Sequence, residues 1–304
     1  MPLSRQRGAW NNLYDFEKTY AAYLSEFEEA LKKYCEGLPE KIPTLKQAMV
    51  YSVMLGGKRI RPVLMLAAAD MLGVPSEEVM PFAVAIEWIH TYSLIHDDLP
   101  AMDNDDYRRG KPSNHKVFGE AMAVLAGDAL LNAAYDLCFT QCFKGEKYVR
   151  ASKYLSEAAG ENGMIAGQSA DILWSEKEQF TEEDLRFIYA YKTGKLLVAP
   201  LAIASILADD RGFLELEEFG RELGRLFQLT DDILDVTGDF GNLGKTVGKD
   251  KEEGKLTCVR LYGLEQSRIE ADLAADACLL ALERLNTDTS FLRDLVHFVR
   301  ERKK

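Results

Sequence analysis

Residues 81–112 read PFAVAIEWIHTYSLIHDDLPAMDNDDYRRGKP, a run that is apolar on more than one face until it ends in aspartates followed by two arginines. The 3.6-residue period of its apolar side chains predicts a helix that is buried on several sides. Pro100 removes a backbone donor and disfavours helical conformation at Leu99, so the helix should end near Asp97 and Asp98. The stretch therefore predicts a core helix that carries negative charge at its carboxyl end.

Helical periodicity continues along the rest of the chain. Glycine and proline divide the 304 residues into about eleven helical segments, and no convincing strand-like alternation appears. Long helices are expected over residues 81–99, 119–142, 214–236 and 256–285. The charge-free run 196–208 is expected to be a buried core helix. No proline- or serine-rich linker separates two halves, so residues 1–304 are predicted to form a single all-α domain.

The composition is that of an ordinary soluble globular protein, with 47% hydrophobic and 28% charged residues. Its 49 acids and 37 bases give a net charge of -12, which argues against nucleic acid or an anionic membrane as the main partner. The first twenty residues lack the apolar core of a secretory signal, and residues 196–208 are too few to span a bilayer. The five cysteines include no C-x-x-C pair. We therefore expect a cytoplasmic protein without membrane insertion.

The aspartates after the first helix suit a cation. Six residues of straight helix would place Asp97 and Asp103 about 240° apart, so both can face one ion only if the chain reverses after Pro100. Carboxylates at a helix carboxyl end also oppose the macrodipole, at a cost of a few tenths to about 1 kcal/mol each. A bound cation would remove that cost. The alternative is a solvated acidic loop.

A second acidic cluster lies in FQLTDDILD, residues 227–235. Asp231, Asp232 and Asp235 are spaced to share one helix face, and their neighbours are apolar, which is not typical of a solvated stripe. Carboxylate oxygens without cysteine ligands suit Mg²⁺. An EF-hand starting at Asp103 fails, because its sixth and twelfth positions would be Arg108 and Asn114. A P-loop ending at residues 244–246 fails as well, because the upstream glycine position holds Asp239.

Basic residues gather at the breakers between the predicted helices. They occur in GGKRIRP at 56–62, Arg108-Arg109, KTGK at 192–195 and GKTVGKD at 244–250. Each alone is typical of a solvated helix end. Together they indicate clamps for diphosphate, because arginine forks and lysine point charges match its oxygens.

These segments resemble one family, the all-helical trans-isoprenyl diphosphate synthases. The resemblance extends from Gly56 to about Thr257. It rests, in the family's order, on GGKRIRP, HTYSLIHDDLPAMDNDDYRRGKP, GQSADI, YKTGKL, FQLTDDILD and GKTVGKD. It implies a bundle of about eleven or more helices around a deep central cavity, and usually a homodimer.

The resemblance also implies roles for individual residues. Mg²⁺ would be held by Asp97, Asp98, Asp103, Asp231, Asp232 and Asp235. The allylic diphosphate would be bound by Arg108, Lys192 and Lys245, and isopentenyl diphosphate by Lys58, Arg61, His90 and Arg109. Lys255 is also expected to bind substrate. Thr193 and Gln228 match positions that line the carbocation. Asp97, Asp98, Asp103, Asp231, Lys192, Thr193 and Gln228 are expected to act in catalysis.

The implied activity is head-to-tail prenyl transfer, in which the departing diphosphate takes up the proton that is lost. Tyr92 and Ser93 are expected to set the product length, because a bulky aromatic at Tyr92 resembles the farnesyl-producing members. A geranylgeranyl product is the main alternative. A terpene cyclase would not need the second diphosphate site, and a non-catalytic subunit would not need all six aspartates. A calcium-binding protein is disfavoured by the EF-hand mismatch.

Overall fold

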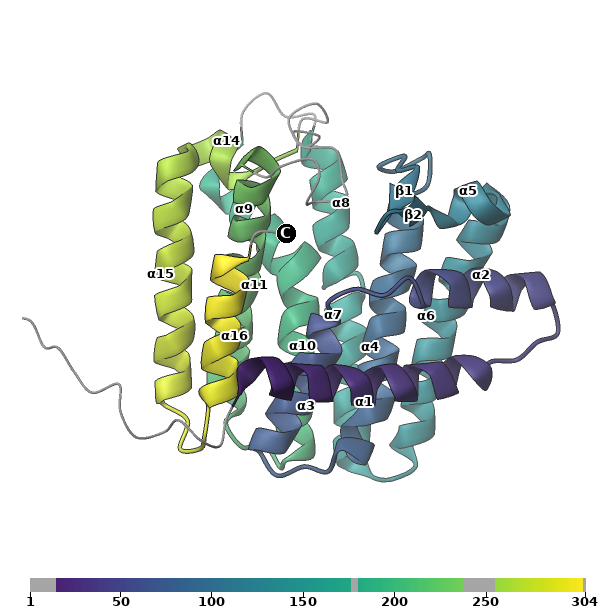
Figure 1. The fold of residues 1–304 in the computed structure, drawn as a ribbon, viewed down its shortest axis with the longest axis horizontal. Helices are drawn as coiled ribbons and strands as arrows, with labels where there is room; N and C mark the ends of the chain where they lie inside the picture. The colour runs from purple at the N-terminus through teal and green to yellow at the C-terminus, as the bar shows by residue number, and fades with distance from the viewer. Residues whose placement is uncertain (1–14, 176–179, 238–254, 303–304) are drawn as a thin grey trace, which may run out of the picture.

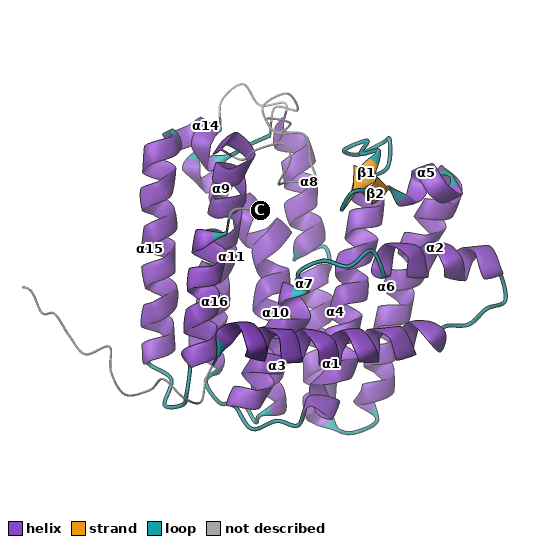
Figure 2. Cartoon of the chain, in the orientation of Figure 1, coloured by secondary structure: helices purple, strands orange, loops and turns teal. Residues whose placement is uncertain are grey.

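The computed structural model describes residues 15–175, 180–237 and 255–302. Its helices are α1 (Phe16–Glu36), α2 (Pro43–Val53), α3 (Ile60–Met71), α4 (Ser76–Asp97), α5 (Asn114–Phe118), α6 (Glu120–Cys142), α7 (Glu146–Ala159), α8 (Met164–Ser175), α9 (Glu182–Ile188), the π-helix η1 (Tyr189–Gly194), α10 (Lys195–Leu207), α11 (Phe213–Thr237), α14 (Cys258–Tyr262), α15 (Leu264–Glu283) and α16 (Ser290–Glu301). The short strands β1 (Tyr107–Arg108) and β2 (Lys111–Pro112) pair antiparallel. The predicted all-α class is confirmed (Figure 2).

The helices form a bundle around α10. Most of the long helices run roughly parallel to one another in Figure 1, whereas α1 crosses in front of them near their lower ends. All side chains from Leu196 to Leu207 are buried, because α10 packs against α3, α4, α7 and α11. The predicted core helix at 196–208 is therefore confirmed, and it continues through Pro200.

Two predicted boundaries were wrong. The helix expected over 81–99 starts earlier, at Ser76, where Glu77 and Glu78 in the first turn complement the helix dipole. The helix expected over 256–285 is interrupted at Gly263, whose φ of 80° lies in a region that residues with a side chain rarely adopt. The chain changes direction there, and α14 and α15 form in place of one long helix.

The reversal predicted after Pro100 is present. The amide of Asp103 donates to the carbonyl of Asp97 at 2.9 Å, and the amide of Asp105 donates to that of Asp98 at 3.2 Å. The following hairpin of β1 and β2 turns at Arg109 and Gly110, which both have positive φ, as a type I′ turn requires. The hairpin therefore keeps Arg108 and Arg109 close to the acidic carboxyl end of α4.

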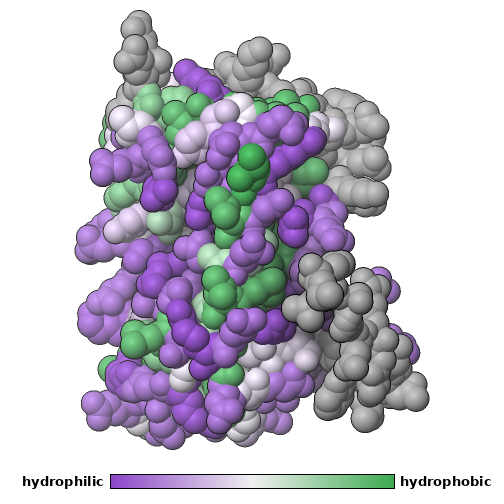
Figure 3. All heavy atoms as spheres, turned by 90° about the vertical axis from the view of Figure 1, so that its left-hand side faces the viewer, coloured by the Kyte–Doolittle hydropathy of each residue, from purple (hydrophilic) through white to green (hydrophobic). Residues whose placement is uncertain are grey.

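Two stretches of described helix are long and apolar enough to cross a membrane, judged by length and composition only. The stretch Glu182–Leu207 is mostly buried inside the protein, as a core helix is. The other, α6, is only 33% buried over its apolar window, so it presents apolar side chains at the surface. Core helices of soluble proteins pass the same test. The face of the molecule on the α15 side is mostly hydrophilic, with hydrophobic side chains gathered along its middle (Figure 3).

A buried ion pair connects α1, α3 and α4 beside the cationic loop, which we define as residues 56–59 before α3. Arg59 precedes α3 with a φ of 49°, and its guanidinium donates to Glu87 at 2.7 Å, to Glu28 at 2.8 Å and to the carbonyl of Val53 at 2.7 Å. Arg59 and Glu87 are 3% and 2% exposed. Because neither charge reaches water, each requires the other.

We expect Arg59→Ala to destabilise the protein strongly, since it leaves the buried Glu87 carboxylate without its hydrogen-bonded ion-pair partner. Removing one partner of a buried pair costs about 3–5 kcal/mol of unfolding free energy. Guanidinium chloride unfolding followed by circular dichroism measures the change. The control is Arg150→Ala, which removes the half-exposed pair with Asp210 and should leave the midpoint nearly unchanged. Equal midpoints for the two variants would contradict the prediction.

Candidate functional site

The carboxyl end of α4 brings Asp97 and Asp103 together near a lysine and a glutamine. The side-chain amide of Gln168, on α8, donates to Asp97, and the Nζ atom of Lys255 lies 3.1 Å from Asp103. Burial raises the pKa of Asp97, as does the neighbouring Asp103 carboxylate, and the charge of Lys192 opposes both. The two carboxylates therefore lie in one partly buried patch that also contains positive charge.

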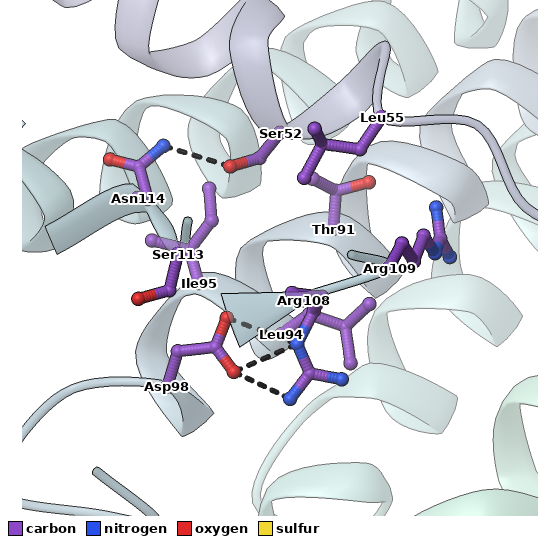
Figure 4. Close-up of a pocket in the computed structure, with 10 residues that line it drawn as sticks. All are labelled: Ser52, Leu55, Thr91, Leu94, Ile95, Asp98, Arg108, Arg109, Ser113 and Asn114. Atoms are coloured by element: carbon purple, nitrogen blue, oxygen red, sulfur yellow. Dashed lines mark hydrogen bonds and ion pairs between the residues drawn. The ribbon is translucent and has the colours of Figure 1, made fainter. Parts of the chain in front are cut away.

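Asp98 points the other way, into a small pocket between α2, α4 and the hairpin (Figure 4). The Nε atom of Arg108 donates to both of its oxygens, at 2.8 and 3.0 Å. Asp98 is only 3% exposed, and burial raises its pKa while the hydrogen bonds from Arg108 lower it. This predicted metal ligand therefore has a dedicated partner, which is itself a predicted diphosphate ligand.

A second group of predicted ligands gathers on the cationic loop before α3. Arg109 lies over Gly57, where a Cβ atom would be 2.6 Å from the guanidinium carbon, and the φ of 129° at Gly57 is one that residues with a side chain rarely adopt. Burial lowers the pKa of Arg61 to about 10, and its Nε atom has no hydrogen-bond partner among the described residues. Lys58 is exposed, and its carbonyl accepts a hydrogen bond from Tyr20.

His90, on α4, faces these arginines. Its pKa is held well below its usual value by burial and by the charges of Arg61 and Arg109, so its imidazole is neutral at physiological pH. A neutral imidazole adds a hydrogen-bond donor and acceptor without adding repulsion. The half-buried Arg61, whose Nε atom has no partner among the described residues, and the neighbouring Arg109 therefore form a site suited to an anion.

The π-helix η1 carries Lys192 and Thr193 between α8 and α11. The Nζ atom of Lys192 lies 2.5 Å from Asp171, on α8. Close backbone contacts fix η1, because a Cβ at Gly167 would overlap the backbone of Lys192 and one at Gly224 would lie 2.8 Å from the Cα of Gly194. Single π-turns of this kind often mark functional sites.

The second acidic motif does not present its three aspartates in one direction. Asp231 is 45% exposed and pairs with Arg302, which also donates to the Phe227 carbonyl at 2.9 Å. Asp232 is 3% exposed and points toward η1. Adjacent helical residues are rotated by about 100°, so this divergence is the expected geometry and the prediction of one shared face was too broad. Asp235 is partly exposed.

The described residues contain no group of three or more histidine, cysteine or acidic side chains placed to hold a metal by themselves. Mg²⁺ does not require such a group, because it usually takes one or two carboxylates and completes its shell with water and phosphate oxygens. Asp97 and Asp103 on one side, and Asp231 on the other, offer oxygens of that kind. The donor set therefore fits Mg²⁺ that is bound together with a diphosphate.

Sequence reasoning did not single out three residues of the site. Gln168 and Asp171 lie within the quoted segment GQSADI, whose position before the π-helix was the available signal. Arg302 gave none, because its role depends on α16 returning to α11. Lys245 lies outside the described residues.

Comparison with known proteins gives consistent matches. A family model described as polyprenyl synthetase matches residues 42–284. The chain is 45% identical over 262 residues to farnesyl diphosphate synthase of Micrococcus luteus, covering 86% of this chain and 90% of that one. It is 44% identical over 280 residues to geranylgeranyl pyrophosphate synthase 7 of Arabidopsis thaliana, covering 90% and 80%.

A solved structure agrees with these matches. The geranyltransferase of Helicobacter pylori, solved in complex with magnesium and isoprenyl diphosphate, superposes with a TM-score of 0.83 at 34% identity. The match covers 95% of this chain and 98% of that one.

Gly167→Ala should lower the melting temperature, because the added methyl group meets backbone of η1 that cannot rotate away. Overpacking of this kind costs about 1–3 kcal/mol, and sometimes more. Differential scanning calorimetry measures the change. Ser169→Ala, at an exposed position two residues away on α8, is the control and should melt as the wild type does. A Gly167→Ala protein as stable as the control would show that α8 and η1 are less tightly packed than described.

Proposed function

The chain belongs to the polyprenyl synthetase family, and on that premise we propose that it condenses isopentenyl diphosphate head-to-tail with dimethylallyl and then geranyl diphosphate to give farnesyl diphosphate. It is an all-helical prenyltransferase of isoprenoid biosynthesis. Its substrates are isoprenoid diphosphates.

The observation that carries this proposal is the presence of two separate anion sites. One contains the carboxylates Asp97 and Asp103 with Lys192 and Lys255 nearby, and can hold a diphosphate through Mg²⁺. The other contains Arg61 and its neighbours, and can hold a diphosphate directly. A condensation of two diphosphates needs two such sites, whereas a cyclase that ionises one diphosphate needs only the first.

We assign Mg²⁺ to Asp97, Asp103, Asp231 and Asp235. Asp98 and Asp232, which were also predicted as ligands, are left out of this assignment because both carboxylates are engaged with other side chains. Mg²⁺ bound there would supply Lewis-acid stabilisation of the diphosphate that leaves the allylic substrate.

The chain's own residues would do the rest. Arg108, Lys192, Lys245 and Lys255 neutralise the allylic diphosphate, and Lys58, Arg61, His90 and Arg109 hold isopentenyl diphosphate. When the allylic C–O bond breaks, its electron pair leaves with the diphosphate. The double bond of isopentenyl diphosphate then forms the new C–C bond to the allylic cation. The departed diphosphate takes the proton lost from the adduct, so no side-chain base is required.

Product length would be set on α4, below the first aspartates. Tyr92 is 5% exposed, its ring meets the ring of His96 edge-on at 5.7 Å, and its hydroxyl has no hydrogen-bond partner among the described residues. A buried ring one turn below Asp97 would close an apolar cavity to a chain longer than farnesyl. Ser93 lies beside it, with its hydroxyl bonded to the carbonyl of His90 at 2.9 Å. A geranylgeranyl product is the second candidate, which the similarity to the Arabidopsis protein favours.

Assembly and location complete the proposal. The outer face of α6 exposes Val124, Leu125 and Phe139, and a second copy of the chain would cover these apolar side chains in a homodimer. The continuous buried core supports the prediction that residues 1–304 form a single domain. We place the enzyme in the cytoplasm.

The direct test incubates the protein with Mg²⁺, isopentenyl diphosphate and a series of allylic diphosphates, and identifies the products by chromatography of the dephosphorylated alcohols. Farnesol is the expected main product. Geranylgeraniol would favour the second candidate, and a cyclic hydrocarbon would contradict prenyl transfer.

Asp97→Ala should lower turnover by several orders of magnitude, because it removes an oxygen ligand that stabilises charge on the leaving group. The steady-state rate with saturating substrates measures this. Asp106→Ala is the matched control, since Asp106 follows the motif, is half-exposed and pairs with Lys116. Normal turnover of Asp97→Ala, or full wild-type activity in excess chelator, would exclude the metal assignment.

Tyr92→Ala should shift the products from farnesyl to longer prenyl diphosphates, because the ring no longer blocks the cavity. A longer prenyl chain pressed against that ring would be destabilised by roughly 1–3 kcal/mol through overpacking, which is enough to stop a further addition. Tyr92→Phe keeps the ring and should keep the wild-type product. Unchanged products from Tyr92→Ala would place the floor of the cavity on another helix.

A further inference from the structure

Asp232 is the end point of a chain of hydrogen bonds that leads to η1. The hydroxyl of Tyr189 and the backbone amide of Cys258, the latter at 2.7 Å, both donate to its Oδ2 atom. The side-chain amide of Gln228 donates to its Oδ1 atom at 3.1 Å. Both oxygens of this buried carboxylate are therefore engaged, whereas those of its neighbour Asp231 lie near the surface.

The chemistry of a carboxylate fixes the direction of the next bonds. When Asp232 is ionised it can only accept, so the Gln228 amide turns its nitrogen toward Asp232 and its oxygen away. That oxygen lies 2.9 Å from the hydroxyl of Thr193, which must therefore donate its single hydrogen to Gln228. The ionised Asp232 carboxylate offers no donor, so it determines the orientation of both the Gln228 amide and the Thr193 hydroxyl.

The Thr193 hydroxyl can therefore act only as an acceptor toward any further neighbour, through the lone pairs of its oxygen. Its hydroxyl hydrogen is committed to Gln228, so the side of the oxygen that remains free is the negative end of the O–H dipole. The residue lies on η1 next to Lys192, where the allylic diphosphate is proposed to bind. A fixed dipole of this kind stabilises positive charge without reorganising when that charge appears.

We propose that Asp232 is a positioning residue rather than a metal ligand, and that through Gln228 it orients the Thr193 hydroxyl so that its oxygen faces the allylic carbocation. The proposal rests on the proposed prenyl transfer. It also accounts for the use of a relay: a carboxylate in contact with the cation could form an ester with it, whereas a neutral hydroxyl whose hydrogen is held away lowers the energy of the cation with far weaker nucleophilicity. Asp232 orients the Thr193 hydroxyl through two successive hydrogen bonds, without contacting the cation itself.

The adjacent aspartates provide the matched test. The Mg²⁺-dependent part of inorganic pyrophosphate binding, measured by isothermal titration calorimetry with and without Mg²⁺, should be weakened at least roughly tenfold in Asp231→Asn and retained within about twofold in Asp232→Asn. Steady-state kinetics of Asp232→Asn should show kcat reduced by at least roughly tenfold, with the KM of both substrates unchanged. Loss of pyrophosphate binding in Asp232→Asn, as in Asp231→Asn, would overturn the proposal.

Coupling between variants separates positioning from a general structural effect. Thr193→Val should reduce kcat by a similar factor, Thr193→Ser should restore most of it, and adding Asp232→Asn to Thr193→Val should cause no further loss. Additive losses would overturn the proposal. If Asp232→Asn does not fold, Gln228→Met replaces it in the same cycle. The calorimetry needs no turnover, so a wild type that makes no prenyl product would refute the proposed function and leave the ligand question about Asp232 answered.

Discussion

Charge placed at the ends of apolar helices must be paired, and the architecture of the site follows from that constraint. A carboxylate that loses water without gaining a partner is among the most costly groups a protein can bury. Asp98 is satisfied by Arg108, Asp103 by Lys255, Asp231 by Arg302, and Glu87 by Arg59. These ion pairs stabilise the acidic and the basic residues together, and neither set would be stable in place without the other.

Patterns that depend on neighbouring residues could be predicted from the sequence, and those that depend on distant packing could not. Pro100 predicted the reversal that brings Asp103 back to Asp97, because proline acts on its own backbone. Gly263 was missed as a break, because a single glycine within a helical pattern is ambiguous until its φ is known. Arg302 was missed and the direction of the Asp232 side chain was not foreseen, since their partners come from α11 and η1 respectively. Local chemistry gave the residues, and tertiary packing gave their directions.

The pairing also shapes how ligands enter. In the proposed reaction, a diphosphate that approaches Lys192 competes with Asp171 for the same ammonium group. A cation that approaches Asp231 competes in the same way with Arg302. Binding is then an exchange of partners rather than the filling of an uncompensated site, so part of each interaction energy is already present in the free protein. Arg61 differs, because its Nε atom has no partner in the part of the chain that the structure describes, and it would gain a new hydrogen bond to a bound diphosphate.

The glycine contacts around η1 have a consequence for redesign of the enzyme. Gly167 and Gly224 hold α8 and α11 against the backbone of η1 itself, so these two contacts contain no side chain that could be trimmed and no room for a larger residue. The contact between α4 and α6, by contrast, is built from side chains, and these can be varied. Directed evolution of chain length would therefore accumulate its substitutions on α4 and α6. The glycine contacts with the backbone of η1 would stay constant, whatever product is selected.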